Sequence, residues 1–135
     1  MRTTTDRHDP NRSRRGLAAV EMALVLPLLA TILFFLVEGA GALKASLVLS
    51  EASREAARLV LRTGETDGAA SLVTAFTTRL AGAAPETSVS VDAAAHTVTV
   101  HVEYAYAPVI GNNPLLAALP DGQLTLRSRT VMPLP

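Results

Sequence analysis

The sequence predicts an α+β protein with a long N-terminal helix (membrane-spanning, then amphipathic), a short second helix and a three-stranded antiparallel sheet. Three observations predict this architecture. An apolar run near the N-terminus is long enough to cross a bilayer. Strong helix formers follow it directly. From about residue 87, apolar and polar residues alternate as they do in half-buried strands.

The charges of the chain are unevenly distributed. The formal net charge is zero, yet residues 1–16 contain five arginines and two aspartates. A basic segment before an apolar run places the N-terminus in the cytoplasm by the positive-inside rule. No basic patch with interleaved aromatic residues exists, so we expect no nucleic-acid binding. The absence of Cys excludes disulfides, thiolate metal sites and cysteine nucleophiles.

The chain divides into four predicted parts. Residues 1–16 are a basic cytoplasmic leader, whose polar composition predicts disorder. Residues 17–37 are a transmembrane helix with Glu21 as the only charged residue, and at about 1.5 Å per residue they cross a bilayer core of about 30 Å. Residues 38–63 continue this helix outside the membrane. Residues 64–135 form a small C-terminal α+β domain.

A cleavable signal peptide is an alternative to the membrane span. Its apolar region would be shorter and would end in a small-residue cleavage site. The run observed here is too long, but Ala40, Ala42 and Ala45 beyond it offer an Ala-x-Ala sequence, so cleavage there stays open.

Composition predicts that the helix continues past the membrane. The segment from Leu43 to Arg62 is rich in Ala, Leu, Arg and Glu and contains no Pro or Gly, and Gly64 is well placed to cap its end. We expect an apolar face that includes Leu47, Val48, Ala52 and Leu59, and ion pairs Glu51–Arg54 and Glu55–Arg58 at i,i+3 spacing.

A short amphipathic helix is predicted over residues 69–81. Thr66 or Asp67 would cap its start, and Gly82 and Pro85 would end it. Its expected apolar face consists of Leu72, Val73, Phe76 and Leu80.

Three strands are predicted in the remaining chain. The first begins at Thr87, and a loose loop at 92–95 connects it to the second. A long loop over 108–122, with a short helical turn at 115–119, leads to a third strand at 123–132. In the second strand one face is expected to carry Val98, Val100, Val102 and Tyr104. A helix laid over one face would bury this sheet.

The segment from Arg14 to Met22 carries the functional information. A carboxylate about one turn inside a bilayer is costly and usually has a partner. If the chain is cut after Gly16, the new amine of Leu17 lies four residues from Glu21, which could neutralise it in the same or a neighbouring subunit. The competing interpretation is that Glu21 reaches back to the membrane surface, and that Arg14 and Arg15 only anchor the helix.

This segment resembles a type IV prepilin cleavage site, with basic residues, Gly16, the hydrophobic Leu17 as first mature residue and Glu21 fifth. Residues 14–58 also resemble the TadE-like family of minor pseudopilins of tight-adherence (Flp-type) pilus systems. The matching pieces are Arg15-Gly16, the run from Val20 to Leu29, Val37-Glu38, and Ala52-Ser53-Arg54-Glu55-Ala56-Ala57-Arg58.

The resemblance implies an assembly protein. A prepilin peptidase would recognise Arg14 and Arg15 and cut between Gly16 and Leu17. The mature chain would sit in the inner membrane as a single-pass protein with its C-terminal domain outside, in a pilus or at its base or tip. Its partners would be other pilins or pseudopilins, the assembly machinery and lipid. Neither catalysis nor a cofactor is expected.

Several sequence features allow two interpretations. Arg54, Glu55 and Arg58 could contact a partner subunit or form a solvated, self-paired helix face. Pro27 could be a functional kink or a tolerated membrane proline, and the small residues from Gly39 to Ser46 could let helices approach closely. His96 and His101 are too scattered to predict a metal site.

Three other functions compete with the assembly protein. One is an unprocessed, signal-anchored protein whose outer domain binds a ligand. Another is a small membrane-tethered enzyme, although no nucleophile elbow or comparable motif supports it. The third is a pseudopilin of a type II secretion machine, against which the motif ending in Arg58 argues.

Overall fold

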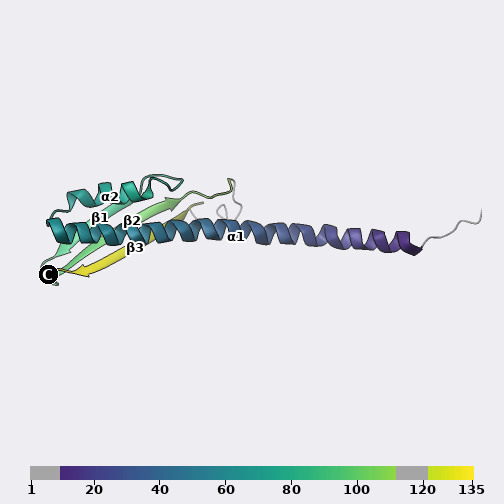
Figure 1. Cartoon of the computed structure of the whole chain (residues 1–135), viewed down its shortest axis with the longest axis horizontal. Helices are drawn as coiled ribbons and strands as arrows, with labels where there is room; N and C mark the ends of the chain where they lie inside the picture. The colour runs from purple at the N-terminus through teal and green to yellow at the C-terminus, as the bar shows by residue number, and fades with distance from the viewer. Residues whose placement is uncertain (1–9, 112–121) are drawn as a thin grey trace, which may run out of the picture. The chain divides into compact units, whose positions relative to one another are not determined.

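The computed structural model describes residues 10–111 and 122–135, and side chains from Gly16 onward. It separates into two compact units, Met1–Leu36 and Val37–Pro135. The elements follow one another as helix α1 (Pro10–Thr63), helix α2 (Asp67–Thr77) and strands β1 (Glu86–Asp92), β2 (Thr97–Tyr106) and β3 (Leu124–Pro133) (Figure 1). The predicted α+β class, with a long and a short helix and three antiparallel strands, is confirmed.

Helix α1 begins at Pro10, seven residues before the predicted transmembrane helix at residues 17–37. Proline is favoured at the first helical position, since its missing N–H would have no partner there and its φ angle already suits a helix. Residues 10–15, which we expected to belong to a disordered leader, are therefore helical. At the other end α1 closes with Gly64, which has φ +73° and donates its N–H to the carbonyl of Val60 at 2.8 Å.

The second half of α1 packs on the sheet through small residues. Its buried stripe consists of Ala45, Leu49, Ala52, Ala56, Ala57 and Val60. Ala52 was predicted to lie on this face, but the expectation for Leu47 was wrong, since that side chain is 63% exposed. Two residues along a helix rotate the side chain by about 200°, so Leu47 points away from the face on which Leu49 is buried.

Helix α2 is shorter than predicted and buries a different set of residues. It ends at Thr77, whereas residue 81 was expected, and Thr66 at its start forms no capping side-chain hydrogen bond. Ala69, Val73 and Thr77 are buried, while Phe76 is 41% exposed. Val73 is thus buried on the apolar face as predicted, whereas Phe76 was wrongly expected to belong to that face.

The strands form a meander in the order β1-β2-β3, and both pairings are antiparallel. Asp92 ends β1 and its Oδ1 accepts the N–H groups of Ala94 and Ala95 at 2.9 and 3.0 Å, which fixes the tight loop before β2. The predicted helical turn at 115–119 lies outside the described residues.

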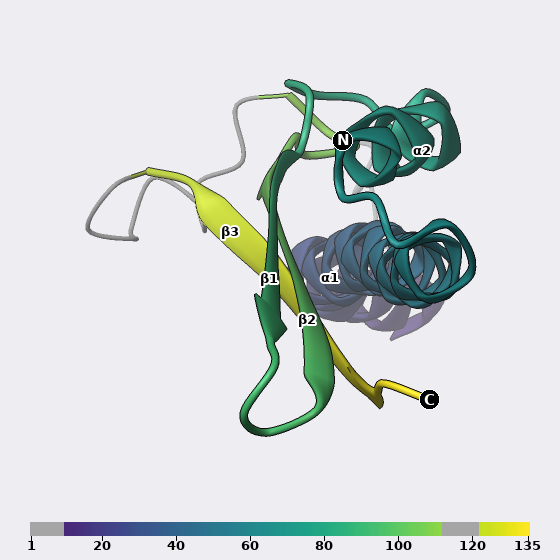
Figure 2. The same ribbon diagram turned by 90° about the vertical axis from the view of Figure 1, so that its left-hand side faces the viewer.

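The core lies between the sheet and the helices. Figure 2 shows α2 and the C-terminal end of α1 on the same side of the three strands. Alternate residues of β2 face them, and the predicted inward set is confirmed and extended by one aromatic residue: Val98, Val100, Val102, Tyr104 and Tyr106. The opposite face is polar, with Glu103 paired to Arg127 at 3.1 Å.

Candidate functional site

The residues of the predicted processing site lie in the first turns of α1. Gly16, Leu17 and Glu21 are exposed on the helix. Leu17 and Glu21 are four residues apart and therefore lie on the same face, about 6 Å apart along the axis. An amine at Leu17 would thus lie about one turn from the carboxylate. Arg14 and Arg15 also belong to α1, but their side chains are outside the described set.

The N-terminal unit presents a surface after Glu21 whose large side chains are all apolar. They are exposed on different faces of the helix, among them Leu24, Leu26, Leu29 and Leu33. Among the described residues, one helix, within Gly16–Thr63, is long and apolar enough to cross a membrane. A helix that is apolar on all sides and has no protein around it needs lipid or other apolar helices as its surroundings. This segment is a candidate membrane span.

Pro27 interrupts the hydrogen bonding of this span. It has no N–H to donate to the preceding turn. The hydroxyl of Thr31, one turn later, donates to the carbonyl oxygen of Pro27 at 2.8 Å. The carbonyl left without this donor is that of Ala23. The Thr31 hydroxyl bonds a different carbonyl, so it does not replace the missing bond, yet α1 continues through Pro27.

Glu38, the first residue after the predicted span, anchors the chain that follows β2. Its side chain is only 8% exposed. One carboxylate oxygen accepts the N–H of Val109 at 3.2 Å and the other accepts that of Ile110 at 3.4 Å. The hydroxyl of Tyr106 donates to the backbone carbonyl of Glu38 at 3.4 Å. Burial, followed by the hydrogen bond and negative charge of Glu38, raises the pKa of Tyr106 to about 12.

Gly41 provides the space for this anchor. A Cβ at Gly41 would lie 2.5 Å from the Tyr106 hydroxyl and 2.6 Å from Cγ2 of Val109, whereas one at Gly39 would meet nothing within 4 Å. The small residues after the span were expected to allow contact between helices. At Gly41 the missing side chain instead allows close contact with the C-terminal end of β2 and the residues after it. Gly39 faces open space within the described structure.

A buried hydroxyl cluster joins α1 to β3. Ser53 is fully buried, and its Oγ lies 3.0 Å from the carbonyl oxygen of Ser50, 2.9 Å from Oγ of Ser128 and 2.8 Å from Oγ1 of Thr130. Ser53 lies within the Ala52–Arg58 motif, so this part of the motif has a role in packing within the domain.

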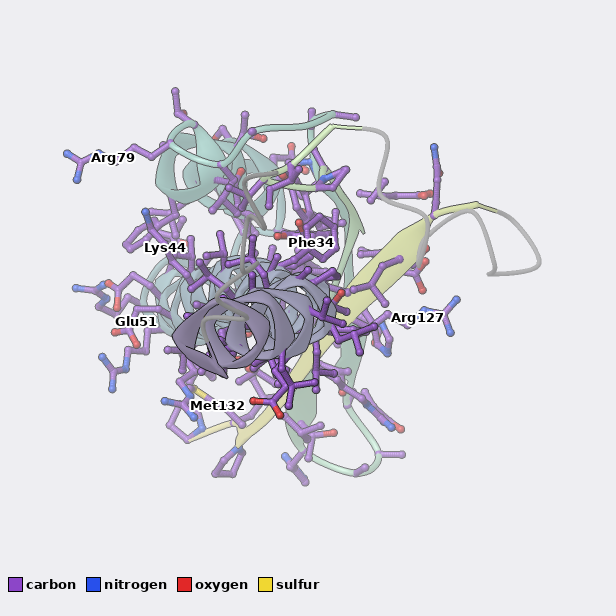
Figure 3. All side chains as sticks on the ribbon, turned by 90° about the vertical axis from the view of Figure 1, so that its right-hand side faces the viewer. Phe34, Lys44, Glu51, Arg79, Arg127 and Met132 are labelled. Carbon is purple, nitrogen blue, oxygen red and sulfur yellow. The ribbon has the colours of Figure 1, made fainter. Side chains whose placement is uncertain are left out.

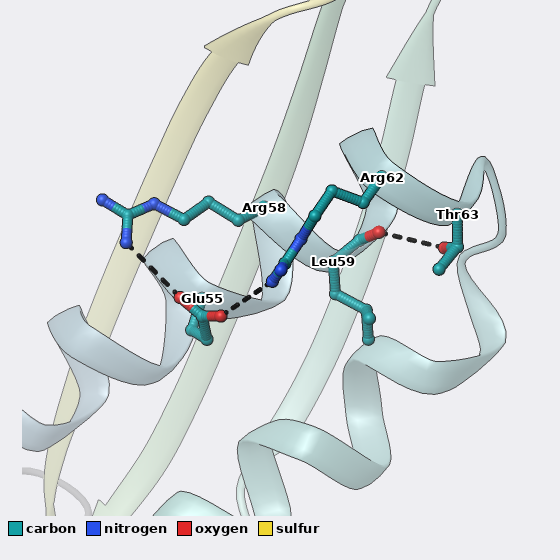
Figure 4. A network of polar contacts seen from close by, with 5 residues as sticks. All are labelled: Glu55, Arg58, Leu59, Arg62 and Thr63. Carbon is teal, nitrogen blue, oxygen red and sulfur yellow. Dashed lines mark hydrogen bonds and ion pairs between the residues drawn. The ribbon is translucent and has the colours of Figure 1, made fainter.

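The charged residues of the same motif lie on the outer face of α1. Glu55 pairs with Arg58 at 3.4 Å, as predicted, and also with Arg62 at 3.0 Å (Figure 4). Within the described part of the chain, Arg54 forms no ion pair with Glu51, contrary to expectation. Exposed pairs of this kind stabilise a fold by less than about 1 kcal/mol. Glu55 and Arg58 are thus self-paired, and Arg54 is exposed.

An open groove runs between α1 and α2. It has a volume of about 600 Å³ and is lined by Lys44, Val48, Glu51, Ala75, Phe76, Arg79 and Leu80. Figure 3 labels Lys44, Glu51 and Arg79 on this side of the molecule. Its lining combines apolar side chains with two cations, Lys44 and Arg79, and the carboxylate of Glu51. Among residues 16–111 and 122–135, no group of three or more His, Cys, Asp or Glu side chains is placed to hold a metal.

Sequence reasoning missed the functions of Glu38 and Gly41. One signal was available, because a carboxylate directly after an apolar run usually has a partner. The partner itself could not be identified, because the hydrogen bonds join residues about 70 positions apart.

Comparison with known proteins supports the interpretation of the N-terminal segment. Residues 16–58 match the model of the family described as TadE-like protein, which confirms the resemblance over about a third of the chain. The match includes Glu21, Glu38, Ser53 and the charged motif, and it ends before α2. No curated protein and no solved structure gives a significant match.

Proposed function

Because residues 16–58 match the TadE-like family of Tad pilus systems, we propose that this protein is a membrane-anchored minor pseudopilin that takes part in assembling a tight-adherence (Flp-type) pilus or a related secretion machine. The observation that carries the proposal is the composition of α1. Its first half is an exposed apolar helix that begins with Gly16, Leu17 and Glu21, and its second half is the packing surface of a small folded domain. A pilin subunit needs both parts, one to pack in membrane or filament and one to be displayed.

The proposed processing step removes the basic leader. A prepilin peptidase hydrolyses the peptide bond between Gly16 and Leu17, with Arg14 and Arg15 holding the bond at the cytoplasmic face. Gly16 favours this step because glycine is a poor helix former and the helix unwinds there at low cost. The exposed position of the bond on α1 is compatible with access.

The proposed assembly step uses Glu21. Cleavage creates a positive amine on Leu17, and Glu21 neutralises it in the same or a neighbouring subunit. A charge pair in an apolar surrounding is attracted more strongly than in water, which favours correct alignment of helices in the bilayer. The apolar face from Leu24 to Leu36 then packs against other subunits, and Arg54 is an exposed charged residue of the motif that a partner can contact.

The experiment that tests this proposal replaces Glu21 by Gln, which keeps the shape and removes the charge. We expect the Glu21→Gln protein to reach the membrane but to assemble poorly, measured as loss of pili or of secretion in the host that lacks the native gene. Glu65→Gln, in the exposed turn after α1, is the matched control and should assemble normally. Normal processing and assembly of Glu21→Gln would show that no Glu21–amine pairing is needed.

A signal-anchored binding protein is the second candidate function. The apolar helix and the folded domain would serve it equally well, and the groove between α1 and α2 offers a binding surface. It predicts that residues 1–16 stay on the mature protein. It does not explain why Glu21 stands at the fifth position after Gly16.

A further inference from the structure

The chain after β2 returns to α1 where that helix leaves the predicted membrane span. The span ends at Val37, and Glu38 directly follows it. Both oxygens of the Glu38 carboxylate are occupied by backbone N–H groups, those of Val109 and Ile110. All of these residues belong to the unit Val37–Pro135, so the contacts lie within one compact body.

These contacts keep Val109 and Ile110 next to Glu38, the first residue after the predicted span. A residue that hydrogen-bonds to the side chain of Glu38 lies within one side-chain length of that position on α1. The close approach at Gly41, less than one turn further along α1, holds Val109 against the helix. Figure 1 shows the chain beyond β2 running beside α1 in this region. The two residues are therefore close to the predicted end of the span.

The side chains at this position are apolar and exposed. Val109 is 60% exposed and Ile110 is 37% exposed, although their backbones are tied to Glu38. Residues 107–111 carry no charge. In water these two side chains would be an exposed apolar patch, while at the bilayer boundary they lose water contact when they meet lipid. The favourable location for them is the membrane surface.

Two cations lie beside this apolar pair. Lys44 and Arg79 line a hollow of about 320 Å³ together with Ala107, Pro108 and Val109. Figure 3 shows Lys44 and Arg79 on the same side of the molecule. Lys44 is about 10 Å along the helix from the end of the span, and its long side chain can reach headgroup phosphates. Basic side chains over an apolar pair are the pattern of an interfacial membrane contact.

We propose that Val109 and Ile110 form a second membrane contact, inserted into the outer-leaflet interface with Lys44 and Arg79 over the lipid phosphates. The span would hold the domain at one point, and this contact would fix its orientation against the bilayer. The proposal rests on the membrane span of the proposed function. The partner is a lipid surface and not another protein, because the contact begins at the end of the span.

The test uses the absence of native Cys, which allows one spin label per protein. Val109→Cys and Ile110→Cys are labelled in the full chain and reconstituted at high dilution into phosphatidylcholine–phosphatidylglycerol vesicles. Collision of the label with oxygen, which concentrates in lipid, is compared with collision with a water-soluble nickel complex. Val131→Cys, an exposed apolar position on the outer face of β3, is the matched control in water. Leu28→Cys reports the span.

We expect labels at 109 and 110 to collide more with oxygen than with nickel, and the label at 131 to show the reverse. The proposal would be overturned if the labels at 109 and 110 collided with nickel as often as the label at 131. It would also be overturned if both labels were shielded from oxygen and from nickel, because such shielding indicates that protein covers them. The Leu28 label separates the two claims. A lipid-exposed Leu28 with water-exposed 109 and 110 rejects only the second contact, whereas a water-exposed Leu28 rejects the span and the proposed function with it.

Discussion

Individual residues in this protein have functions that depend on distant parts of the chain. Gly41, Glu38 and Tyr106 form one contact in which each needs the others. Gly41 leaves space that the hydroxyl end of Tyr106 occupies. The Glu38 carboxylate accepts a backbone N–H of the segment that follows β2. Two substitutions test this contact, one through its packing and one through its ionisation.

Gly41→Ala should destabilise the C-terminal unit, residues 37–135, while Gly39→Ala should not. Both changes add helix propensity, by up to about 1 kcal/mol. Only the methyl at position 41 meets the Tyr106 hydroxyl and Val109, and overpacking of this kind costs about 1–3 kcal/mol. Chemical denaturation followed by circular dichroism measures the difference. Equal stability of the two variants would mean that the segment after β2 does not pack on α1.

Tyr106 should make stability sensitive to alkaline pH. Its pKa is raised in the folded protein from 10.0 to about 12. The contribution to stability is therefore fully present below pH 10 and is lost as the pH rises from 10 through about 12, because the unfolded chain ionises first. Tyr106→Phe should show a smaller loss of unfolding free energy between pH 9 and 11.5 than the unmodified protein. An equal loss of unfolding free energy in both proteins would show that ionisation of Tyr106 does not cause the sensitivity to alkaline pH.

At the scale of elements, the sheet was the most predictable part of the fold. Alternation identified the inward residues of β2, from Val98 to Tyr104, because a strand has an unambiguous period of two. Helix faces were harder to predict. Their spacing placed Leu47 and Phe76 on the apolar faces of the two helices, but both are exposed. Helices α1 and α2 also bury small residues such as Ala52 and Ala69, which let the elements come close.

The predicted processing motif depends on local spacing alone, since Gly16, Leu17 and Glu21 lie within six residues of one another, and it stays a prediction. The anchor at Glu38 was not predictable. It joins the end of the span to residues after β2, and no local periodicity reports a contact over that distance. The same holds for Ser53, whose burial depends on the hydroxyls of Ser128 and Thr130.

The C-terminal unit, residues 37–135, should fold without the apolar half of α1. Residues 37–135 form a compact unit that contains all the buried hydrophobic residues of the described chain. We expect this fragment to be soluble and to unfold cooperatively on heating, followed by circular dichroism. A fragment that begins at residue 50 is the matched comparison and should be less stable, because it lacks Glu38, Ala45 and Leu49. A non-cooperative transition in the longer fragment would contradict the division into two units.

At the scale of the whole molecule, helix α1 contains both the exposed apolar segment and the residues that pack on the sheet of the small α+β domain. The apolar segment begins at the proposed processing site. The whole TadE-like match falls on α1, whereas α2 and the three strands lie beyond the matched residues. The part of this protein that is similar to the family is therefore helix α1.

The measurement that tests the central claim most directly is the intact mass, with N-terminal sequencing, of the protein purified from membranes of its own host. The account predicts a mature chain that begins at Leu17, which would make the protein a prepilin-peptidase substrate. A chain that begins at Met1 would contradict the proposed processing. The protein would then be an unprocessed, signal-anchored protein whose function would have to reside in the C-terminal unit, residues 37–135.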